Sequence, residues 1–197
     1  MPYRELQSHL FTIDTALLTR QCVIRRFREG EGEVLFGLIR ASHDYLYDHY
    51  PDLPELVGED KQKAEAFVRQ RIADWLLQKK FTFGIWENES TDLVGLLQID
   101  HLNWRIPSAE ISFFVRPDRA EEIQLLEVVA RAVRFAFRQL ELEKLTYKVL
   151  SDNFAGQRLA RKVGFSREGD LRNEFRKGSG TLVDGLRFGL SRETYGE

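Results

Sequence analysis

The run Ala109-Glu110-Ile111-Ser112-Phe113-Phe114-Val115 is typical of a β-strand, and the most regular helical pattern of the chain follows it. In that pattern apolar residues recur three or four positions apart, which predicts a helix over 121–140. A short apolar strand is predicted next, over 145–150. A strand, a helix and a second strand in this order cross over right-handed, so the two strands are expected to lie close together and roughly parallel. A crevice between such strands is where a ligand is expected.

The segments around this unit predict one mixed α/β domain built on a central sheet. Helical spacing predicts a helix that begins near Val34 and is stopped by Pro51 and Pro54, and a second, amphipathic helix over 59–80. Further strands are predicted over 21–27, 81–86, 93–99 and 109–116, the last three as a meander with a turn at 87–92. After 145–150 the pattern predicts a short helix over 155–163 that Gly164 ends, and a closing hairpin around 177–180.

The composition fits one globular domain. The chain has 197 residues, of which 30% are charged and 43% hydrophobic, and at about 150 residues per domain there is little room for a second. We therefore expect a single domain over 1–197, with 1–20 as an N-terminal extension. The net charge of −2 excludes a global field that would draw the chain onto nucleic acid or an anionic membrane. No apolar stretch approaches the ~20 residues that cross a bilayer.

Several kinds of chemistry find little support. The single cysteine, Cys22, excludes an internal disulfide, suits a reducing cytoplasm, and is most simply a small core residue rather than a nucleophile. Walker loops, dinucleotide-binding glycine motifs, nucleophile elbows and paired CxxC motifs are absent. His43, Asp44, Asp48 and His49 do not predict a metal site, because histidines six residues apart lie on different faces of a helix.

A set of short motifs is shared with one known family. The most specific lies late in the chain, where Asn153 and then Arg158 lead into Lys162-Val163-Gly164-Phe165. The others are Phe83-Gly84-Ile85-Trp86, Leu93-Val94-Gly95, the strand 109–115 and Glu168-Gly169-Asp170-Leu171-Arg172. Together they resemble the GNAT acyltransferases, specifically the RimJ/RimL-like branch, which acetylates amino groups. The resemblance covers roughly 21–190 and implies the GNAT fold, a mostly antiparallel sheet with two splayed parallel central strands and flanking helices.

The resemblance implies that acetyl-CoA binds between the splayed strands. Backbone amides around Phe114 and Val115 would hold the pantetheine arm and the thioester carbonyl, and Asn153 would hydrogen-bond the arm from the other side. Asn is also a favoured helix N-cap, and the two roles can coexist. An amine held against the thioester would attack it directly while amides stabilise the oxyanion, so that no covalent enzyme intermediate is needed.

The resemblance also suggests groups for acid–base chemistry. Glu110 matches a glutamate common in the branch and is the candidate to draw a proton from the acceptor ammonium, through water. The alternative is a solvated strand residue that pairs with a neighbouring arginine. Many GNAT enzymes carry a tyrosine general acid seven residues after the asparagine, where this chain has Ala160, and the branch often lacks that tyrosine. The branch's usual serine three residues after the asparagine is here Gly156.

The loop before the central helix departs from the family. The resemblance assigns the cofactor pyrophosphate to Arg119, Ala120, Glu122 and Gln124, with Arg158 nearby. Of the pattern only Arg119 fits, because Glu122 and Gln124 replace glycines. A helix N-terminus attracts anions, but Asp118 and Glu121 have the spacing of a capping box and are expected to bond the first N–H groups of the helix themselves. Three explanations stay open: another path of the loop, compensation by nearby arginines, or loss of CoA binding.

Two functions follow from these motifs. The first is an acetyl-CoA-dependent N-acetyltransferase that acts by direct attack of a primary amine, on a protein N-terminus or a small molecule. The second is a GNAT-fold protein with a degenerate pyrophosphate loop that serves as a binding or interaction module. Homodimerisation, common among relatives, is a further expectation. Candidates for the acceptor groove, which are equally consistent with ordinary core or rim positions, are Tyr45, Tyr47, Tyr50, Trp75, Trp104 and His101.

Overall fold

The computed structural model describes residues 6–120 and 123–196. Within these residues the strands form one eight-stranded sheet in the order β1-β2-β3-β4-β5-β6-β8-β7. β5 and β6 are parallel, and every other neighbouring pair is antiparallel. The strands are β1 (Ala16–Leu18), β2 (Cys22–Arg26), β3 (Phe81–Glu87), β4 (Leu93–Asn103), β5 (Ser108–Val115), β6 (Lys144–Leu150), β7 (Ser166–Arg176) and β8 (Leu182–Ser191).

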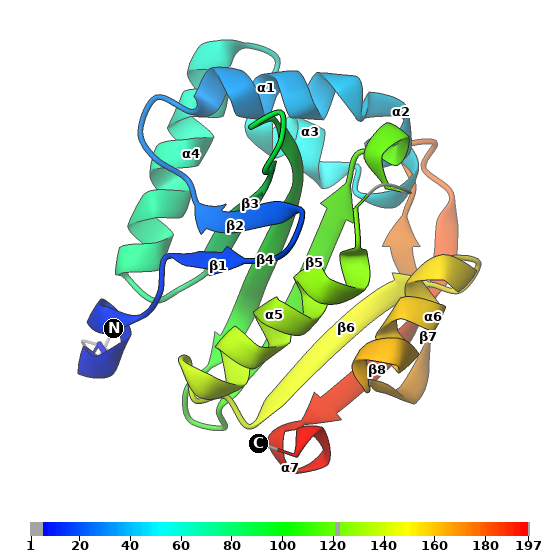
Figure 1. Cartoon of the computed structure of the whole chain (residues 1–197). Coiled ribbons are helices and arrows are strands. Elements are labelled where there is room, and N and C mark those ends of the chain that lie inside the picture. Colours follow the sequence, from blue (N-terminus) through cyan, green and yellow to red (C-terminus); the bar gives the residue numbers. More distant parts are fainter. Residues whose placement is uncertain (1–5, 121–122, 197) are drawn as a thin grey trace.

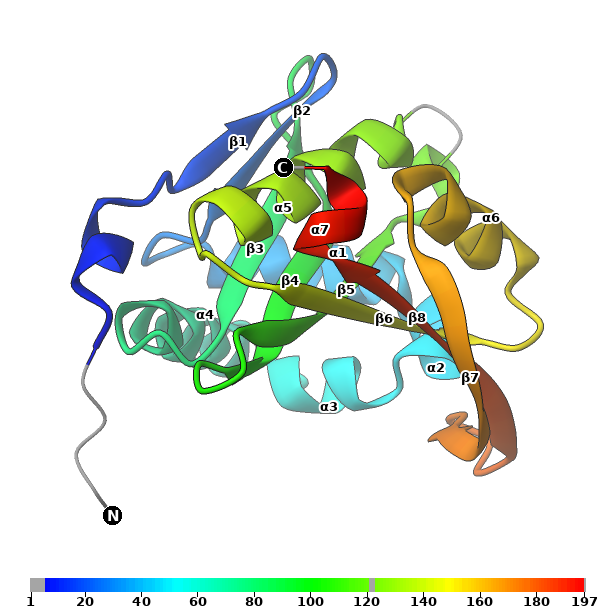
Figure 2. The same cartoon turned by 90° about the horizontal axis from the view of Figure 1, so that it is seen from below.

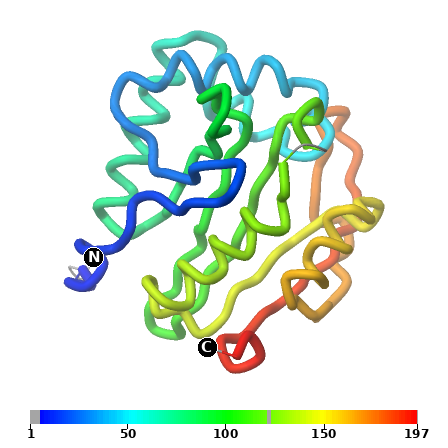
Figure 3. The backbone as a smooth tube through the Cα atoms, in the orientation of Figure 1, coloured from blue at the N-terminus to red at the C-terminus, as the bar shows by residue number. Residues whose placement is uncertain are grey.

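Helices cover both faces of this sheet (Figures 1 and 2). α5 and α6 lie on one face, and α1 to α4 pack against the other. Figure 3 shows the crossover, in which the chain leaves β5, runs back along α5 and returns as β6. The helices are α1 (Gly32–Ala41), α2 (His43–His49), α3 (Asp52–Val57), α4 (Lys61–Leu76), α5 (Leu125–Arg138), α6 (Phe154–Val163) and α7 (Arg192–Tyr195), with short 3₁₀ helices η1 (Ser8–Thr12) and η2 (Pro117–Arg119).

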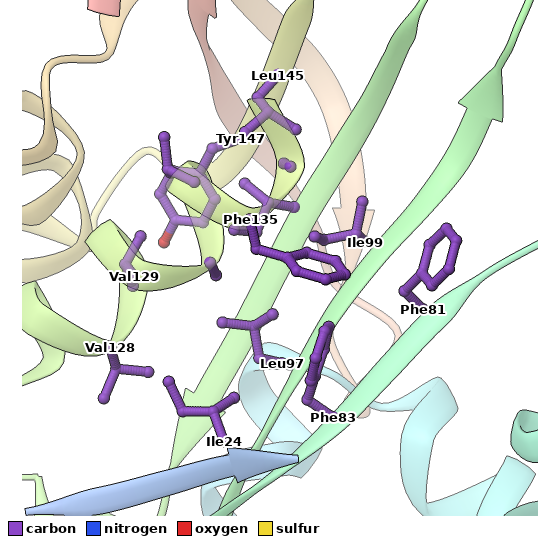
Figure 4. Packing of buried hydrophobic residues seen from close by; sticks show 14 of the residues in the cluster. Ile24, Phe81, Phe83, Leu97, Ile99, Val128, Val129, Phe135, Leu145 and Tyr147 are labelled. Carbon is purple, nitrogen blue, oxygen red and sulfur yellow. The ribbon is translucent and has the colours of Figure 1, made fainter. Parts of the chain in front are cut away.

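The larger core lies between α5 and the sheet (Figure 4). The regular stripe of α5 places Val128, Val129 and Phe135 against β-strand residues such as Phe83, whose ring meets that of Phe135 edge-on with centroids 5.4 Å apart. Cys22 belongs to this core and is fully buried, and burial raises the pKa of its thiol, which confirms the interpretation as a core residue. A second core lies between α1 to α4 and the opposite face of the sheet.

The predicted order of elements is confirmed, including the meander of β3 to β5, the parallel pair β5 and β6, and the closing hairpin of β7 and β8. Gly164 ends α6 with a φ of 110°, a left-handed conformation that suits glycine. β1 lies in the segment 1–20 and extends the sheet by pairing with β2.

Two features of the helices were predicted wrongly. The helix after β5 begins at Leu125 rather than 121, because Gln124 has a non-helical ψ of 78°. The helical segment does end before Pro51, at His49 of α2, but Pro54 lies inside a further helix, α3, that was not predicted. Pro54 lies in the first turn of α3, where a missing N–H removes no intrahelical hydrogen bond.

Candidate functional site

The parallel pair β5 and β6 parts along its length. Its register joins Ser108–Glu110 to Lys144–Thr146 and ends there, while β5 continues to Val115 and β6 to Leu150. Figure 1 shows the two strands diverging toward their carboxyl ends. This opening is the splayed arrangement that the GNAT resemblance implied.

The backbone of β5 alternates between its two neighbours. The Arg116 N–H donates to the Val94 carbonyl of the β4 side over 2.8 Å. In an antiparallel ladder, residues two apart point the same way, so the Phe114 amide and carbonyl also face β4. Those of Phe113 and Val115 then face the opposite way, toward the opening. Of the predicted pair Phe114 and Val115, it is therefore Val115 whose N–H is directed at the opening.

A tyrosine from the helical side contacts the same strand. The Tyr50 hydroxyl donates to the Phe113 carbonyl oxygen over 2.9 Å, at the level where β6 has moved away. Burial raises the pKa of Tyr50 well above its ordinary value, so this hydroxyl stays protonated and able to donate. The bond holds β5 from the side that the parallel partner no longer covers.

An aromatic pair bridges the base of the opening. Phe113 of β5 and Tyr147 of β6 stack with ring centroids 5.3 Å apart and planes 13° from parallel. Tyr147 is buried, and burial raises the pKa of its hydroxyl. Figure 4 shows Tyr147 on the α5 side of the sheet. The rings give the opening an apolar floor.

Asn153 stands at the start of α6 on the β6 side. Its side-chain oxygen accepts a hydrogen bond from the Gly156 N–H over 2.8 Å, which confirms the N-cap role. The amide nitrogen of Asn153 and the hydroxyl of Tyr147 both lie within 3.1 Å of the point where a Cβ of residue 156 would stand. The Cβ of a serine at position 156 would also lie only 2.9 Å from Val149 Cγ2. This close packing explains why the chain has glycine here in place of the serine of the branch.

Glu110 takes part in a charged cluster with a lysine rather than the expected arginine. Lys148 Nζ lies 2.8 Å from Glu174 and 3.5 Å from Glu110. The hydrogen bond with Glu174, and then the charge of Glu110, raise the pKa of Lys148 against the opposing effect of burial. The cluster lies where β5 and β6 begin to part, on the face that carries α1 to α4, and borders a polar cavity of about 310 Å³.

The loop before α5 differs from its prediction. Asp118 does not cap the helix, because both its carboxylate oxygens accept bonds from Arg116, at 3.0 and 2.7 Å. This pairing lowers the pKa of Asp118. The Gln124 N–H, at the start of α5, donates instead to the side-chain oxygen of Gln21 over 2.9 Å. A neutral amide oxygen thus takes the place expected for a carboxylate.

The other predicted phosphate residues surround this loop. Arg119 closes η2 and pairs with Glu87 at 3.7 Å. The Ala120 N–H follows the same turn and donates to Pro117. Arg158 is exposed on α6. Glu121 and Glu122, to which the capping box and part of the phosphate loop were assigned, lie outside the described residues.

A second cavity, of about 410 Å³, lies between α2 to α4 and the sheet, and we call it the acceptor cavity. It reaches Phe113 and Phe114 at one side and Lys80 at the other. Its apolar lining includes Tyr50, Leu53, Leu56, Phe67, Leu96, Phe114 and Phe175. Its polar lining is His49, Asp52, Arg71, Lys80, Gln98, Ser112, Glu174 and Arg176.

Of the aromatic candidates for the acceptor groove, Tyr50 is among the lining residues. Trp75 is buried in the larger core and Trp104 packs against it. Tyr45 stacks on His49, and Tyr47 packs against Gly178 at the tip of the β7–β8 hairpin, whose N–H donates to the Tyr47 carbonyl over 2.8 Å. His101 borders the polar cavity instead.

Sequence reasoning did not single out Tyr147, Lys148 or Arg71. Tyr147 and Lys148 could have been assigned to opposite faces of β6, because successive side chains of a strand point to opposite faces of the sheet. Arg71 carried no signal, since on an amphipathic helix it is one of several charged residues and only packing shows which of them faces a cavity.

In residues 6–120 and 123–196, no group of three or more His, Cys, Asp or Glu side chains is placed to hold a metal ion. No helix in this part of the chain has both the length and the apolar character needed to cross a membrane.

The family model for the acetyltransferase (GNAT) domain matches residues 21–166, and the chain belongs to this family of acetyltransferases. Among curated relatives, an uncharacterized N-acetyltransferase, YoaA, from Bacillus subtilis (strain 168) is 26% identical over 168 residues, covering 85% of this chain and 92% of that protein.

Solved structures agree on the fold. The ribosomal-protein-S5-alanine acetyltransferase from Vibrio fischeri matches with a TM-score of 0.85 at 10% identity, over 93% of this chain and 100% of that one. RimL, a ribosomal L7/L12 alpha-N-protein acetyltransferase in complex with coenzyme A, matches with a TM-score of 0.81 at 15% identity, over 90% and 98% of the two chains. The predicted GNAT fold is confirmed, and its solved neighbours include the RimL type.

Proposed function

We propose that this protein transfers the acetyl group of acetyl-CoA to a primary amine, on a protein N-terminus or a small molecule, by direct attack. The observation that supports this most is the parting of β5 and β6 after Glu110 and Thr146, with the Val115 N–H directed into the opening. Solved relatives of the same fold include one in complex with coenzyme A. The opening offers a backbone donor on one side and the Asn153 amide nitrogen on the other.

In this proposal acetyl-CoA supplies a thioester, and the amine nitrogen forms the new C–N bond as the C–S bond breaks. The Val115 N–H donates to the carbonyl oxygen, whose negative charge grows during attack, and a fixed backbone donor stabilises that charge without reorganising. The Gly156 N–H donates to the side-chain oxygen of Asn153. This bond fixes the orientation of the side-chain amide, so that its nitrogen would donate to the pantetheine arm. Holding both reactants in place supplies most of the remaining rate.

The acceptor would approach from the face that carries α1 to α4, where the acceptor cavity reaches Phe113 and Phe114. An ammonium must lose a proton before it attacks. Glu174 lines the acceptor cavity and Glu110 the polar cavity, and Lys148 lies between these two carboxylates. Glu110 remains our proposed proton acceptor, through water, with Lys148 fixing its position.

One observation favours the alternative, a GNAT-fold binding module that no longer uses CoA. The N–H at the start of α5 donates to Gln21, and Arg116 is held by Asp118, so two groups suited to the pyrophosphate already have partners. Asp118 is exposed and Gln21 is half-buried, so a ligand can displace both side chains, whereas the opening itself is built into the register of the sheet. We therefore place the transferase first.

The test is release of the CoA thiol from acetyl-CoA across a panel of peptides and small amines, together with acetyl-CoA binding by calorimetry. Turnover of at least one amine, reduced in the Asn153→Ala variant, is the expected result. Binding without any turnover contradicts the proposed reaction. Absence of both binding and turnover supports the binding module.

A further inference from the structure

Resting on the proposed function, we infer that the acceptor is a short peptide or similar amine with an apolar body and a free carboxylate, which binds Arg71 and Lys80 at the far end of the acceptor cavity. The amine would lie at the opposite end, beside Phe113 and Phe114. The geometry of the two ends, the walls between them and the distribution of charge each support this class.

The two ends of the cavity are separated along the sheet as well as across it. The reactive end lies at β5, where Phe113 and Phe114 line the cavity. The Nζ of Lys80 is held over β4 by Gln98 and Asp100, whose partners in β5 lie two and four positions before Phe114. At about 4.8 Å across one strand and about 3.4 Å per residue along it, the far end is about 10 Å from Phe114. A tripeptide spans this length, because an extended chain covers about 3.3–3.6 Å per residue.

The walls between the ends are apolar. Leu53 and Leu56 come from α3, Phe67 from α4, Leu96 from β4 and Phe175 from β7. Such walls favour an acceptor with apolar side chains, since burial of apolar surface is worth about 25 cal/mol per Å². The volume of about 410 Å³ lies within the usual range of about 300–1,000 Å³ for small-molecule sites.

Arg71 is held as a ready donor in the lining of the cavity. Asp74 binds its Nη2 over 2.8 Å, and the Gln70 amide holds the other oxygen of Asp74 over 2.9 Å. The guanidinium also lies 4.8 Å from the centre of the Phe67 ring. Among the described residues, the buried Arg71 Nε has no hydrogen-bond partner. A guanidinium fixed from behind in this way is suited to a carboxylate from the cavity.

Lys80 adds a second cation to the lining of the same cavity. Its Nζ is held by Asp100 over 2.9 Å and by Gln98 over 3.1 Å. Lys80 and Arg71 both line the cavity, whereas neither Asp74 nor Asp100 is among the lining residues that the structure describes. The ligand therefore meets the cations first.

The same distribution excludes a polyamine as the preferred acceptor. A second ammonium group at the far end would meet Arg71 and Lys80. Of the two carboxylates in the lining, Glu174 is already bound to Lys148. The remaining one, Asp52, lies at the start of α3 rather than at the far end.

The test compares one tripeptide in two forms, Ala-Leu-Leu with a free carboxylate and the same tripeptide as its C-terminal carboxamide. Binding is measured by calorimetry at pH 7 without acetyl-CoA, with spermidine as a third ligand. The acid should bind about tenfold tighter than the amide, since hydrogen bonds to charged groups are the stronger ones. Spermidine should bind more weakly than either peptide.

Variants of Arg71 test whether its guanidinium causes the preference for the free carboxylate. Arg71→Met should remove the preference for the acid, and Arg71→Lys should retain part of it. Arg69→Met is the matched control, because Arg69 lies on the same helix, is 63% exposed and pairs with Glu65. This control should leave the preference unchanged. Circular dichroism and the midpoint of thermal unfolding check that each variant is folded, and the comparison of acid with amide in the native protein needs no variant.

Equal binding of acid and amide, tighter binding of spermidine, or no binding of either peptide would overturn this inference. Thiol release from acetyl-CoA is measured separately with the same ligands. A preference for the acid without acetyl-CoA binding or turnover would overturn the proposed function but leave the carboxylate site standing. Turnover of the amide as fast as the acid would overturn the carboxylate site but leave the proposed function standing.

Discussion

The Tyr50 hydroxyl donates to the carbonyl oxygen of Phe113 over 2.9 Å, and this bond joins the region between α2 and α3 to the central strand β5. The Phe113 carbonyl faces the side on which β6 has parted from β5. Without the tyrosine, this carbonyl would exchange a fixed partner for water, because Phe113 lines the acceptor cavity.

Tyr50→Phe should therefore destabilise the protein by about 0.5–1.5 kcal/mol, the net contribution of a hydrogen bond that water can replace. For a chain of this size the midpoint of thermal unfolding should fall by about 2–4 °C per kcal/mol. Tyr47→Phe is the control, because Tyr47 is 44% exposed. If both variants unfold at the native temperature, the bond does not support β5.

Asn153 can be tested for its two roles separately. Asn153→Ser keeps an N-cap and removes the amide nitrogen. Asn153→Ala removes both, and its free energy of unfolding should be lower by a further ~1 kcal/mol, within a usual range of about 0.5–2 kcal/mol. If the amide nitrogen binds the pantetheine arm, both variants should weaken acetyl-CoA binding in calorimetry to a similar extent. Native affinity in the serine variant would show that Asn153 acts as a cap alone.

The Gln21 side chain should compete with the phosphates of CoA, because it accepts the Gln124 N–H at the start of α5. Gln21→Ala should tighten CoA binding by about three- to tenfold, as one more amide becomes available to the anion. Pantetheine, which has no phosphate, is the control ligand and should bind the variant as it binds the native protein. An equal change for both ligands would show that Gln21 acts on the loop in another way.

The charged cluster of Lys148 predicts a dependence on alkaline pH. Its pKa is raised, so its stabilising contribution is present below the ordinary value of 10.5 and is lost as pH rises through the raised value. Glu174→Gln should lower the free energy of unfolding in urea by about 0.5–1 kcal/mol at pH 8, and the difference from the native protein should disappear above the raised pKa.

Glu193→Gln is the control for that titration, because Glu193 is exposed on α7. A difference between native and Glu174→Gln proteins that persists unchanged at the most alkaline pH would contradict the assignment of the stabilising pair to Lys148.

Local patterns were enough to predict most of the fold. The α5 stripe, the meander and the turn at 87–92 depend on residues within one or two turns of each other. The start of α5 depended on Gln124, whose N–H binds a side chain 103 positions away, and periodicity carries no information on such a contact. α3 was missed because proline stops a helix in its interior but is accepted in its first turn.

The candidate site divides in the same way. The opening follows from the crossover and the family motifs, so Val115 and Asn153 could be found in the sequence. Which backbone group faces the opening depends on the register with β4, and the pairing of Glu110 with Lys148 depends on two strands meeting. The acceptor cavity requires α2, α3, α4 and β7 together, so Arg71 could be recognised only once they were packed.

The central claim is that acetyl-CoA binds in the opening through the Val115 N–H, and the direct measurement is calorimetric titration of acetyl-CoA into the native protein and into Val115→Pro. Proline removes this N–H, suits the extended strand and breaks no bond to β4, because residue 115 faces away from it. We expect the native protein to bind and Val115→Pro to bind at least about tenfold more weakly. Because Val115 is buried in the larger core, the variant should unfold at a lower temperature, and circular dichroism at the titration temperature checks that it is folded. No binding by the native protein, or equal binding by both, would contradict the account.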